Sequence, residues 1–180
     1  MVDTKNHPVW DVYDEFRTAR LNTLCYSRQL STLTRINTTI EVLLAIFTSS
    51  TIASFWFWDT DIGQYSWQVF GVISAILAIL KPILNLTDKI KKKSEIAAAY
   101  RELDQDFLNL RIKINQERKY SEYIKKQFDN LLKKKKEIVL RYKDDGGAPC
   151  KRLVNKCFEQ VQNELPVEIF YIPVEEEYDK

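Results

Sequence analysis

Two charged side chains, Glu41 and Lys81, interrupt otherwise apolar stretches of the sequence. A charge within an apolar segment is costly unless it is paired or borders a polar path, so it indicates a place where charges neutralise one another or where ions pass. With about 100° of rotation per helical residue, Asn37, Thr48 and Thr51 fall in one sector with Glu41. We therefore predict that Asn37, Glu41, Thr48 and Thr51 line a pore.

Glu41 and Lys81 can be interpreted in two ways. Counted inward from Ile36 and Leu86, the ends of the two apolar stretches, each charge lies five residues deep, so an antiparallel pair of helices places both at one depth. In the first interpretation the two side chains form a neutralising ion pair. In the second, Lys81 extends to the membrane surface and Glu41 forms a ring at the mouth of an oligomeric pore.

A group of basic residues toward the end of the long polar region forms the second candidate site. Cations neutralise phosphate groups and an aromatic ring stacks on a base, so the group predicts a binding site for a nucleotide ligand. The alternative is that these lysines are a solvated helix face. The predicted ligand-binding residues are Lys133, Lys134, Lys135, Lys136, Arg141, Tyr142, Lys143, Lys151 and Arg152.

Residues suited to catalysis are almost absent. His7 is the one histidine, and the sequence has no glycine-rich phosphate loop, helical zinc pair or CxxC motif. Cys150 and Cys157 are seven residues apart and lack a nearby histidine, so we expect free thiols rather than zinc ligands, and the same holds for Cys25. We predict no catalytic residues, no metal site, no cofactor and no enzymatic activity.

Two apolar stretches, Ile36 to Trp58 and Trp67 to Leu86, hold Glu41 and Lys81. Each is long enough as a helix to cross about 30 Å of hydrocarbon, and aromatic residues cluster around the short loop Asp59 to Ser66. We predict a transmembrane helical hairpin whose partner is the lipid bilayer. A soluble helical bundle built around a very apolar hairpin is the alternative.

Basic residues flank the predicted hairpin on one side only. The loop holds two aspartates and no Lys or Arg, whereas Arg28 and Arg35 precede the first stretch and four lysines closely follow the second. Since basic flanks stay in the cytoplasm, we expect a multi-pass membrane protein with both termini cytoplasmic. After the hairpin, residues 86–143 carry a net charge of +8 (17 basic minus 9 acidic) and residues 144–180 one of −5 (4 minus 9), so a basic region precedes an acidic tail.

A heptad pattern follows the hairpin. Apolar residues recur at alternating spacings of four and three, which is typical of a long helix with one apolar seam. Since no Gly or Pro interrupts the pattern, we predict one continuous helix from about Ser94 to Lys143. A hairpin folded at residues 116–121 is the alternative, because that stretch is polar. The seam positions are Ile96, Tyr100, Leu103, Phe107, Leu110, Ile114, Glu117, Ser121, Ile124, Phe128, Leu131, Lys135, Ile138 and Tyr142.

An apolar seam of this length needs a partner. The amphipathic segment before the hairpin can cover part of it and copies of the same helix the rest, so we predict a homo-oligomer, with a tetramer as one candidate size. The polar seam residues Glu117, Ser121 and Lys135 would then restrict register or subunit number. Loose local packing at these positions is the alternative.

The predicted fold is an all-α membrane protein in four segments. They are an amphipathic N-terminal helix (1–35), the transmembrane hairpin (36–86), a long, basic, coiled-coil-like cytosolic helix (87–143) and a small C-terminal segment (144–180). In the last segment we expect a short helix over Cys150 to Glu164 and an edge strand or extended docking segment over Val167 to Val174.

The order of these elements resembles the SLATT family, the two-span effectors of bacterial anti-phage defence. The resemblance covers about residues 10–143, with a long cytosolic helix that starts at Lys89-Ile90-Lys91-Lys92-Lys93. It implies an effector of the bacterial inner membrane that forms pores or disrupts the membrane when a nucleotide signal changes. In the Hailong branch a similar effector is held inactive by DNA oligomers from a partner nucleotidyltransferase, so the implied ligand is a DNA oligomer or a cyclic nucleotide.

We therefore expect an oligomeric pore-forming or membrane-disrupting effector of anti-phage defence, gated by a cytosolic nucleotide or oligonucleotide. The alternative is a non-conducting membrane anchor or scaffold that recruits a cytosolic partner through its coiled-coil helix. Ion conductance distinguishes the two functions, because only the first depolarises a membrane.

Overall fold

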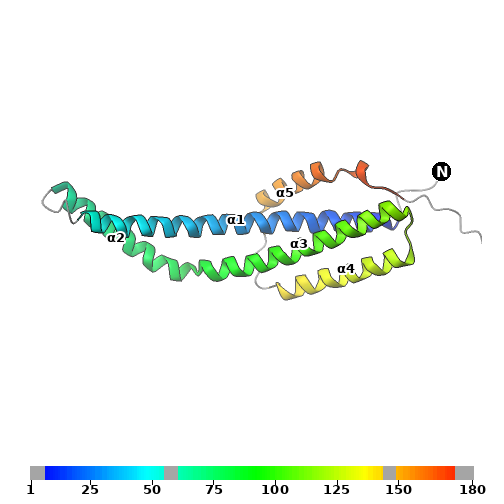
Figure 1. Cartoon of the computed structure of the whole chain (residues 1–180), viewed down its shortest axis with the longest axis horizontal. Helices are drawn as coiled ribbons and strands as arrows, with labels where there is room; N and C mark the ends of the chain where they lie inside the picture. The colour runs from blue at the N-terminus through cyan, green and yellow to red at the C-terminus, as the bar shows by residue number, and fades with distance from the viewer. Residues whose placement is uncertain (1–6, 55–60, 144–148, 173–180) are drawn as a thin grey trace, which may run out of the picture. The chain divides into compact units, whose positions relative to one another are not determined.

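The computed structural model describes residues 7–54, 61–143 and 149–172, and these residues form helices and connecting turns without a β-strand (Figure 1). Hydrophobic periodicity and the scarcity of Gly and Pro favour this all-helical result. The helices are α1 (Val9–Ser54), α2 (Asp61–Leu84), α3 (Leu86–Glu117), α4 (Glu122–Arg141), α5 (Lys151–Glu164) and a 3₁₀ turn, η3 (Val167–Ile169).

The chain divides into two compact units. Unit 1 consists of residues 1–29 and 93–180, and unit 2 of residues 30–92. The predicted N-terminal amphipathic helix and the first predicted apolar stretch are parts of one helix, because α1 runs without a break from Val9 to Ser54. Unit 1 is therefore built from two segments that are distant in the sequence.

The core of unit 1 is the apolar seam of α3 and α4 packed against the apolar faces of α1 and α5. In α1, Val9, Val12 and Tyr13 are fully buried, and Phe16 is 3% exposed. Seam residues of α3 and α4 are buried within the same chain, so they need no second copy to cover them. These buried seam residues are Ile96, Tyr100, Leu103, Phe107, Leu110, Ile114, Ile124, Phe128 and Ile138.

The prediction of one continuous helix from Ser94 to Lys143 is wrong. α3 ends at Glu117 and α4 begins at Glu122, so the alternative, a hairpin folded within 116–121, is found. Arg118 adopts a left-handed backbone conformation (φ 52°), which a helix cannot continue through. The Ser121 side chain then accepts a hydrogen bond from the Ile124 backbone N–H and caps α4.

Polar residues in the seam have partners within the same chain. The Ser121 hydroxyl donates to Glu117 Oε2 at 3.3 Å, across the turn that separates the two helices. Lys135 Nζ forms an ion pair with Glu15 of α1. These polar positions therefore terminate helices or pair within the chain, so none of them is needed to set a subunit number.

Up to residue 172, where the described part of the chain ends, the C-terminal part of unit 1 contains the predicted helix and no edge strand, and the segment after the helix packs on α1, as in the alternative of a docking segment. α5 lies within the expected range, whereas Val167–Ile169 form a 3₁₀ turn and Val174 lies outside the described residues. The segment packs on α1: the Phe170 ring stacks on Tyr13 with centroids 4.3 Å apart, and the Tyr13 hydroxyl donates to the Tyr171 carbonyl at 2.5 Å. Aromatic packing on a helix thus replaces strand pairing.

Part of the loop predicted over Asp59 to Ser66 is helical in unit 2. α2 begins at Asp61, so residues 61–66 are helical, while Asp59 and residues 55–58 lie outside the described part of the chain. At its other end α2 contains Pro82 in its last turn, and Asn85 takes a left-handed conformation (φ 43°). The proline removes a backbone donor and the asparagine tolerates the turn, which explains the 42° bend between α2 and α3.

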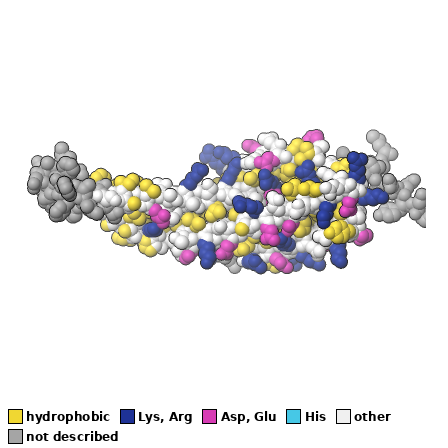
Figure 2. Space-filling model, viewed as in Figure 1, with side chains coloured by type: hydrophobic (Ala, Val, Ile, Leu, Met, Phe, Trp, Pro, Cys, Tyr) yellow, Lys and Arg dark blue, Asp and Glu magenta, His cyan; other side chains and the backbone are white. Residues whose placement is uncertain are grey.

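Apolar side chains point outward over unit 2 (Figure 2). Leu86 is the one buried hydrophobic residue among its described side chains. By length and composition, the described residues contain one helix that can cross a membrane, within Val9–Phe47, or two if the bent pair α2 and α3 counts as one span. The exposed large hydrophobic residues of unit 2 are Ile36, Val42, Leu43, Ile46, Tyr65, Val69, Val72, Ile73, Ile76, Ile79, Leu80, Ile83 and Leu84.

Candidate functional site

The polar cluster of unit 2 consists of Asn37, Glu41 and Lys81. Lys81 Nζ on α2 lies 3.1 Å from Glu41 Oε1 on α1, and Asn37 Nδ2 donates to the same oxygen at 3.1 Å. The pairing follows from the equal depth of the two charges in neighbouring antiparallel helices. The side chains of Glu41 and Lys81 remain 50% and 39% exposed. The cluster is therefore neutral as a pair but open on one side.

The other two predicted pore-lining residues, Thr48 and Thr51, lie on α1, two and three turns beyond Glu41. Their side chains are outside the described part of the chain. Among the predicted pore residues, the structure therefore brings together Asn37 and Glu41, with Lys81 as their common partner from α2.

The predicted nucleotide-binding group is divided between two environments. Lys134 forms ion pairs with Glu102 at 2.8 Å and Asp106 at 2.6 Å on α3, and Lys135 pairs with Glu15. These two lysines connect helices of unit 1 and present little free positive charge to a ligand. Tyr142 is half-buried, and the remaining members are exposed: Lys133, Lys136, Arg141, Lys143, Lys151 and Arg152.

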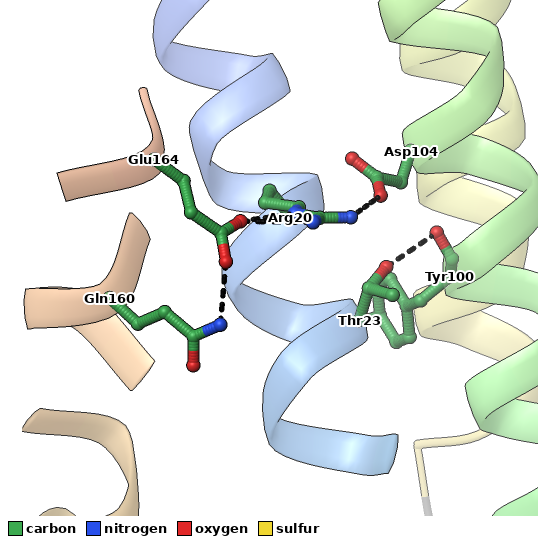
Figure 3. Close-up of polar contacts among 6 residues, drawn as sticks. All are labelled: Arg20, Thr23, Tyr100, Asp104, Gln160 and Glu164. Carbon is green, nitrogen blue, oxygen red and sulfur yellow. Dashed lines mark hydrogen bonds and ion pairs between the residues drawn. The ribbon is translucent and has the colours of Figure 1, made fainter. Parts of the chain in front are cut away.

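A polar network in unit 1 surrounds Arg20 of α1 (Figure 3). The Arg20 guanidinium donates to Asp104 Oδ2 on α3 at 3.0 Å and to Glu164 Oε2 on α5 at 2.9 Å. Gln160 donates to the other Glu164 oxygen at 2.5 Å. One turn along α1, the Thr23 hydroxyl donates to the Tyr100 carbonyl at 2.9 Å. The network therefore joins three helices.

Asp104 and Glu164 experience opposite electrostatic environments. The Asp104 side chain is only 3% exposed, and burial raises its pKa although Arg20 opposes this effect. Asp104 Oδ1 has no hydrogen-bond partner among the described residues. The pKa of Glu164 is lowered by the hydrogen bond from Gln160 and by those from Arg20. Glu164 is therefore the carboxylate whose ionised form the folded state favours.

The stabilising effect of Glu164 is expected to depend on pH. A lowered pKa in the folded state adds stability above the unfolded value of 4.5, and this stability is lost as the pH falls through the folded value. The Glu164→Gln variant should therefore be less stable than the unchanged protein at pH 7, by no more than about 1 kcal/mol because the side chain is partly exposed. The difference should shrink below pH 4.5. Urea unfolding followed by circular dichroism measures it, and a difference independent of pH would contradict the assignment.

Cys25 and Cys157 are buried free thiols, and Cys150 is an exposed one. Burial, with a hydrogen bond to Cys157, raises the pKa of Cys25 to about 12. Such a thiol is inert toward electrophiles while the unit is folded. The described residues contain no group of three or more His, Cys, Asp or Glu side chains able to hold a metal ion.

Sequence reasoning did not find the Arg20 network. Its three charged members are separated by 84 and 144 positions, so no local motif connects them. The available signal was the position of Asp104 beside Leu103 and three residues before Phe107, at the margin of the seam. A carboxylate at that margin requires a cation from a neighbouring helix.

Comparisons with known proteins do not add a relative. No family model, curated protein or solved structure matches the chain.

Proposed function

We propose that this chain is a membrane protein that assembles with copies of itself around a polar path lined by Asn37, Glu41 and Lys81. The observation that carries the proposal is the exposure of a charged pair on an apolar surface. Glu41 and Lys81 are 50% and 39% exposed beside outward-facing residues such as Val42 and Leu80. In hydrocarbon such a pair is costly, so its open side needs water or another subunit.

The outward-facing apolar side chains of unit 2 support a bilayer environment. An apolar surface of this extent on a soluble protein favours aggregation or demands a partner. The alternative of a soluble bundle with an apolar core hairpin would place these side chains inside, whereas Ile79 and Ile83 are 63% and 70% exposed. Lipid is the environment that leaves such residues stable and the helices intact.

Assembly is supported by the polar cluster rather than by the heptad seam. The seam is buried within the chain, so it supplies neither a coiled-coil interface between subunits nor a free surface for a recruited protein. A scaffold would therefore need a surface other than the seam to recruit its partner. The polar pair still favours self-association in the membrane, because the Glu41 and Lys81 pairs of neighbouring copies can face one another.

The biological role that we propose is the one implied by the SLATT resemblance: a pore-forming or membrane-disrupting effector of anti-phage defence. The nucleotide ligand stays a prediction of that resemblance, and the ion pairs of Lys134 and Lys135 reduce the predicted site to its exposed members. Titration of the purified full chain with short single-stranded DNA and cyclic dinucleotides tests the ligand.

Ion flux tests the proposed function directly. Vesicles loaded with potassium and containing the purified protein are expected to lose their gradient faster than empty vesicles. Vesicles that contain an unrelated two-span protein serve as a second control. A protein that resists extraction by alkaline carbonate but leaves the gradient intact would be an anchor, and this outcome would overturn the pore.

A further inference from the structure

The basic end of unit 1 is the surface at which α4 ends and α5 begins. Its cationic side chains are exposed, and they form no ion pair within the described residues. Dark blue side chains gather over the first turns of α5 in Figure 2. The acidic residues of the same stretch are Glu137, which is exposed, and Asp144 and Asp145, which lie outside the described residues. We define the basic end by Lys136, Arg141, Lys143, Lys151, Arg152 and Lys156.

The direction of α5 places its first turn at the end of unit 1 where α1 leaves. Glu164 near the end of α5 binds Arg20, whereas Gln160, one turn earlier, accepts a hydrogen bond from Arg28. α5 therefore runs antiparallel to α1, and its start at Lys151 lies toward Gln29, the last residue of α1 in unit 1.

The direction of α4 places its last turn at the same end. Lys134 binds Glu102 on α3, whereas Lys113, later on α3, donates to the Tyr123 hydroxyl at the start of α4. α4 therefore runs antiparallel to α3, and Arg141 lies toward the start of α3 in unit 1. Lys93 Nζ donates to Gln29 Oε1 at 3.0 Å, so α1 and α3 leave unit 1 side by side.

Apolar side chains accompany these cations. Leu140 is 62% exposed and shares a face of α4 with Lys136, four residues earlier, while Lys143 follows the end of the helix. Phe158 is 47% exposed and lies two turns after Lys151 on the same face of α5. Lysine or arginine next to exposed Leu and Phe is the pattern of helices that lie in a membrane interface.

The start of α5 contains cations without an acidic residue in the same turn. A helix N-terminus carries partial positive charge and favours acidic residues, yet the first turn of α5 has none and instead contains Lys151 and Arg152. The N-cap Cys150 makes no side-chain hydrogen bond to the helix. Together with exposed Leu140 and Phe158, this arrangement suits a surface that offers both negative charge and hydrocarbon.

We propose that the basic end of unit 1 docks on an anionic lipid surface, with lipid phosphates bound by its Lys and Arg side chains and with Leu140 and Phe158 inserted among the headgroups. Only residues 30–35 separate Gln29 from Ile36, where the apolar stretch begins, so lipid headgroups are within reach of the chain. The proposal rests on the membrane location of unit 2 proposed above. A free nucleotide would use the cations but leave the two apolar side chains in water.

Cys150 provides a natural probe for this docking. It is the exposed thiol and adjoins Lys151, whereas Cys25 and Cys157 are 2% and 0% exposed and should resist labelling. The full chain is labelled at Cys150 with an environment-sensitive maleimide dye and reconstituted into vesicles. Pure phosphatidylcholine is compared with equal parts of phosphatidylcholine and phosphatidylglycerol. In the anionic vesicles the dye is expected to be shielded from a water-soluble quencher, and added salt should reverse the shielding.

Neutral variants test which cations bind the lipid. Lys151→Gln with Arg152→Gln is expected to lower the ratio of docked to undocked protein about 30-fold, since each cation near an anionic surface contributes about 1 kcal/mol, which is about a fivefold factor. The matched control is Lys125→Gln with Lys126→Gln, which removes the same charge near the start of α4, at the opposite end of that helix. The control variant should keep the shielding.

Three results separate the possible failures. Equal quenching in neutral and anionic vesicles, in protein that resists carbonate extraction, overturns the docking proposal and leaves the membrane location intact. Release of the protein by carbonate overturns the membrane location of unit 2. Shielding in neutral vesicles that requires added single-stranded DNA or cyclic dinucleotide identifies the basic end as a nucleotide site and also overturns lipid docking.

Discussion

Neutralising each member of the charge pair should shift ion selectivity in opposite directions. Vesicles with the Glu41→Gln variant are expected to become more permeable to anions relative to cations, and those with Lys81→Gln more permeable to cations, each by at least about tenfold. A unit charge about 4 Å from a passing ion contributes about 4 kcal/mol at an effective dielectric constant of about 20, and about 1.4 kcal/mol already changes a ratio tenfold. Glutamine keeps a polar side chain of similar size, so the helices should still pack.

Reversal potentials measured under a salt gradient report these ratios. The matched control is Thr39→Val on α1, close to Glu41 in the sequence but outside the polar cluster, and it should leave selectivity unchanged. Exchanging the two charges, with Glu41→Lys and Lys81→Glu together, restores a neutral pair and should restore the selectivity that either reversal alone destroys. If both glutamine variants conduct like the unchanged protein, the cluster is not part of the ion path.

Replacing Arg20 should have the largest effect on the stability of unit 1. Arg20→Met keeps most of the aliphatic packing but leaves Asp104, with a side chain 3% exposed, without its cation. Removing one partner of a buried ion pair costs about 3–5 kcal/mol, and the partial exposure of Arg20 places the expected loss near the lower limit, at about 3 kcal/mol. Urea unfolding measures the loss, and the reactivity of the buried Cys25 and Cys157 thiols reports it locally.

Two further variants distinguish a lost charge pair from general damage. Lys125→Met removes an ion pair with Glu122 in which the Lys125 side chain is 58% exposed and the Glu122 side chain 90% exposed. This variant should lower the free energy of unfolding by less than about 0.5 kcal/mol. Arg20→Met combined with Asp104→Leu removes the unpaired buried carboxylate and should recover much of the stability. If Arg20→Met costs no more than Lys125→Met, the network does not stabilise the unit.

The faces of the helices were predictable, but their partners were not. The alternation of four and three identified residues such as Leu103, Phe107 and Ile124, all of which are fully buried. The same pattern fits a seam covered by another subunit or by the same chain, because periodicity describes one helix and contains no information about the other surface. The cover comes from α1, α4 and α5, and this long-range choice depends on the turn after Glu117.

That turn shows why the continuous helix was the main prediction and the hairpin at residues 116–121 only the alternative. No Gly or Pro marks it, and the heptad register continues across it without a gap. The left-handed residue is Arg118, a type that rarely adopts positive φ, and its guanidinium lies over the Tyr171 ring at 6.0 Å. The conformation is thus supported by a contact 53 positions away in the sequence, which local reasoning does not detect.

One candidate site could be predicted from the sequence, and the others depended on contacts between distant segments. The contact between Glu41 and Lys81 could be anticipated because both charges lie at equal depth from the ends of two adjacent stretches. The Arg20 network required knowledge of the tertiary fold. The basic group was recognised by composition, but composition did not separate Lys134 and Lys135, which pair with acids of α3 and α1, from the exposed cations of the basic end.

The division of unit 1 into residues 1–29 and 93–180 affects how the protein is made. The 63 residues of unit 2, 30–92, are translated between these segments, which takes roughly 3–13 s at about 5–20 residues per second. During that interval the apolar face of α1, with Val9, Val12 and Phe16, has no α3 to cover it. With the membrane location proposed for unit 2, insertion of its helices precedes completion of the core of unit 1, so the apolar face of α1 needs another cover until α3 is made.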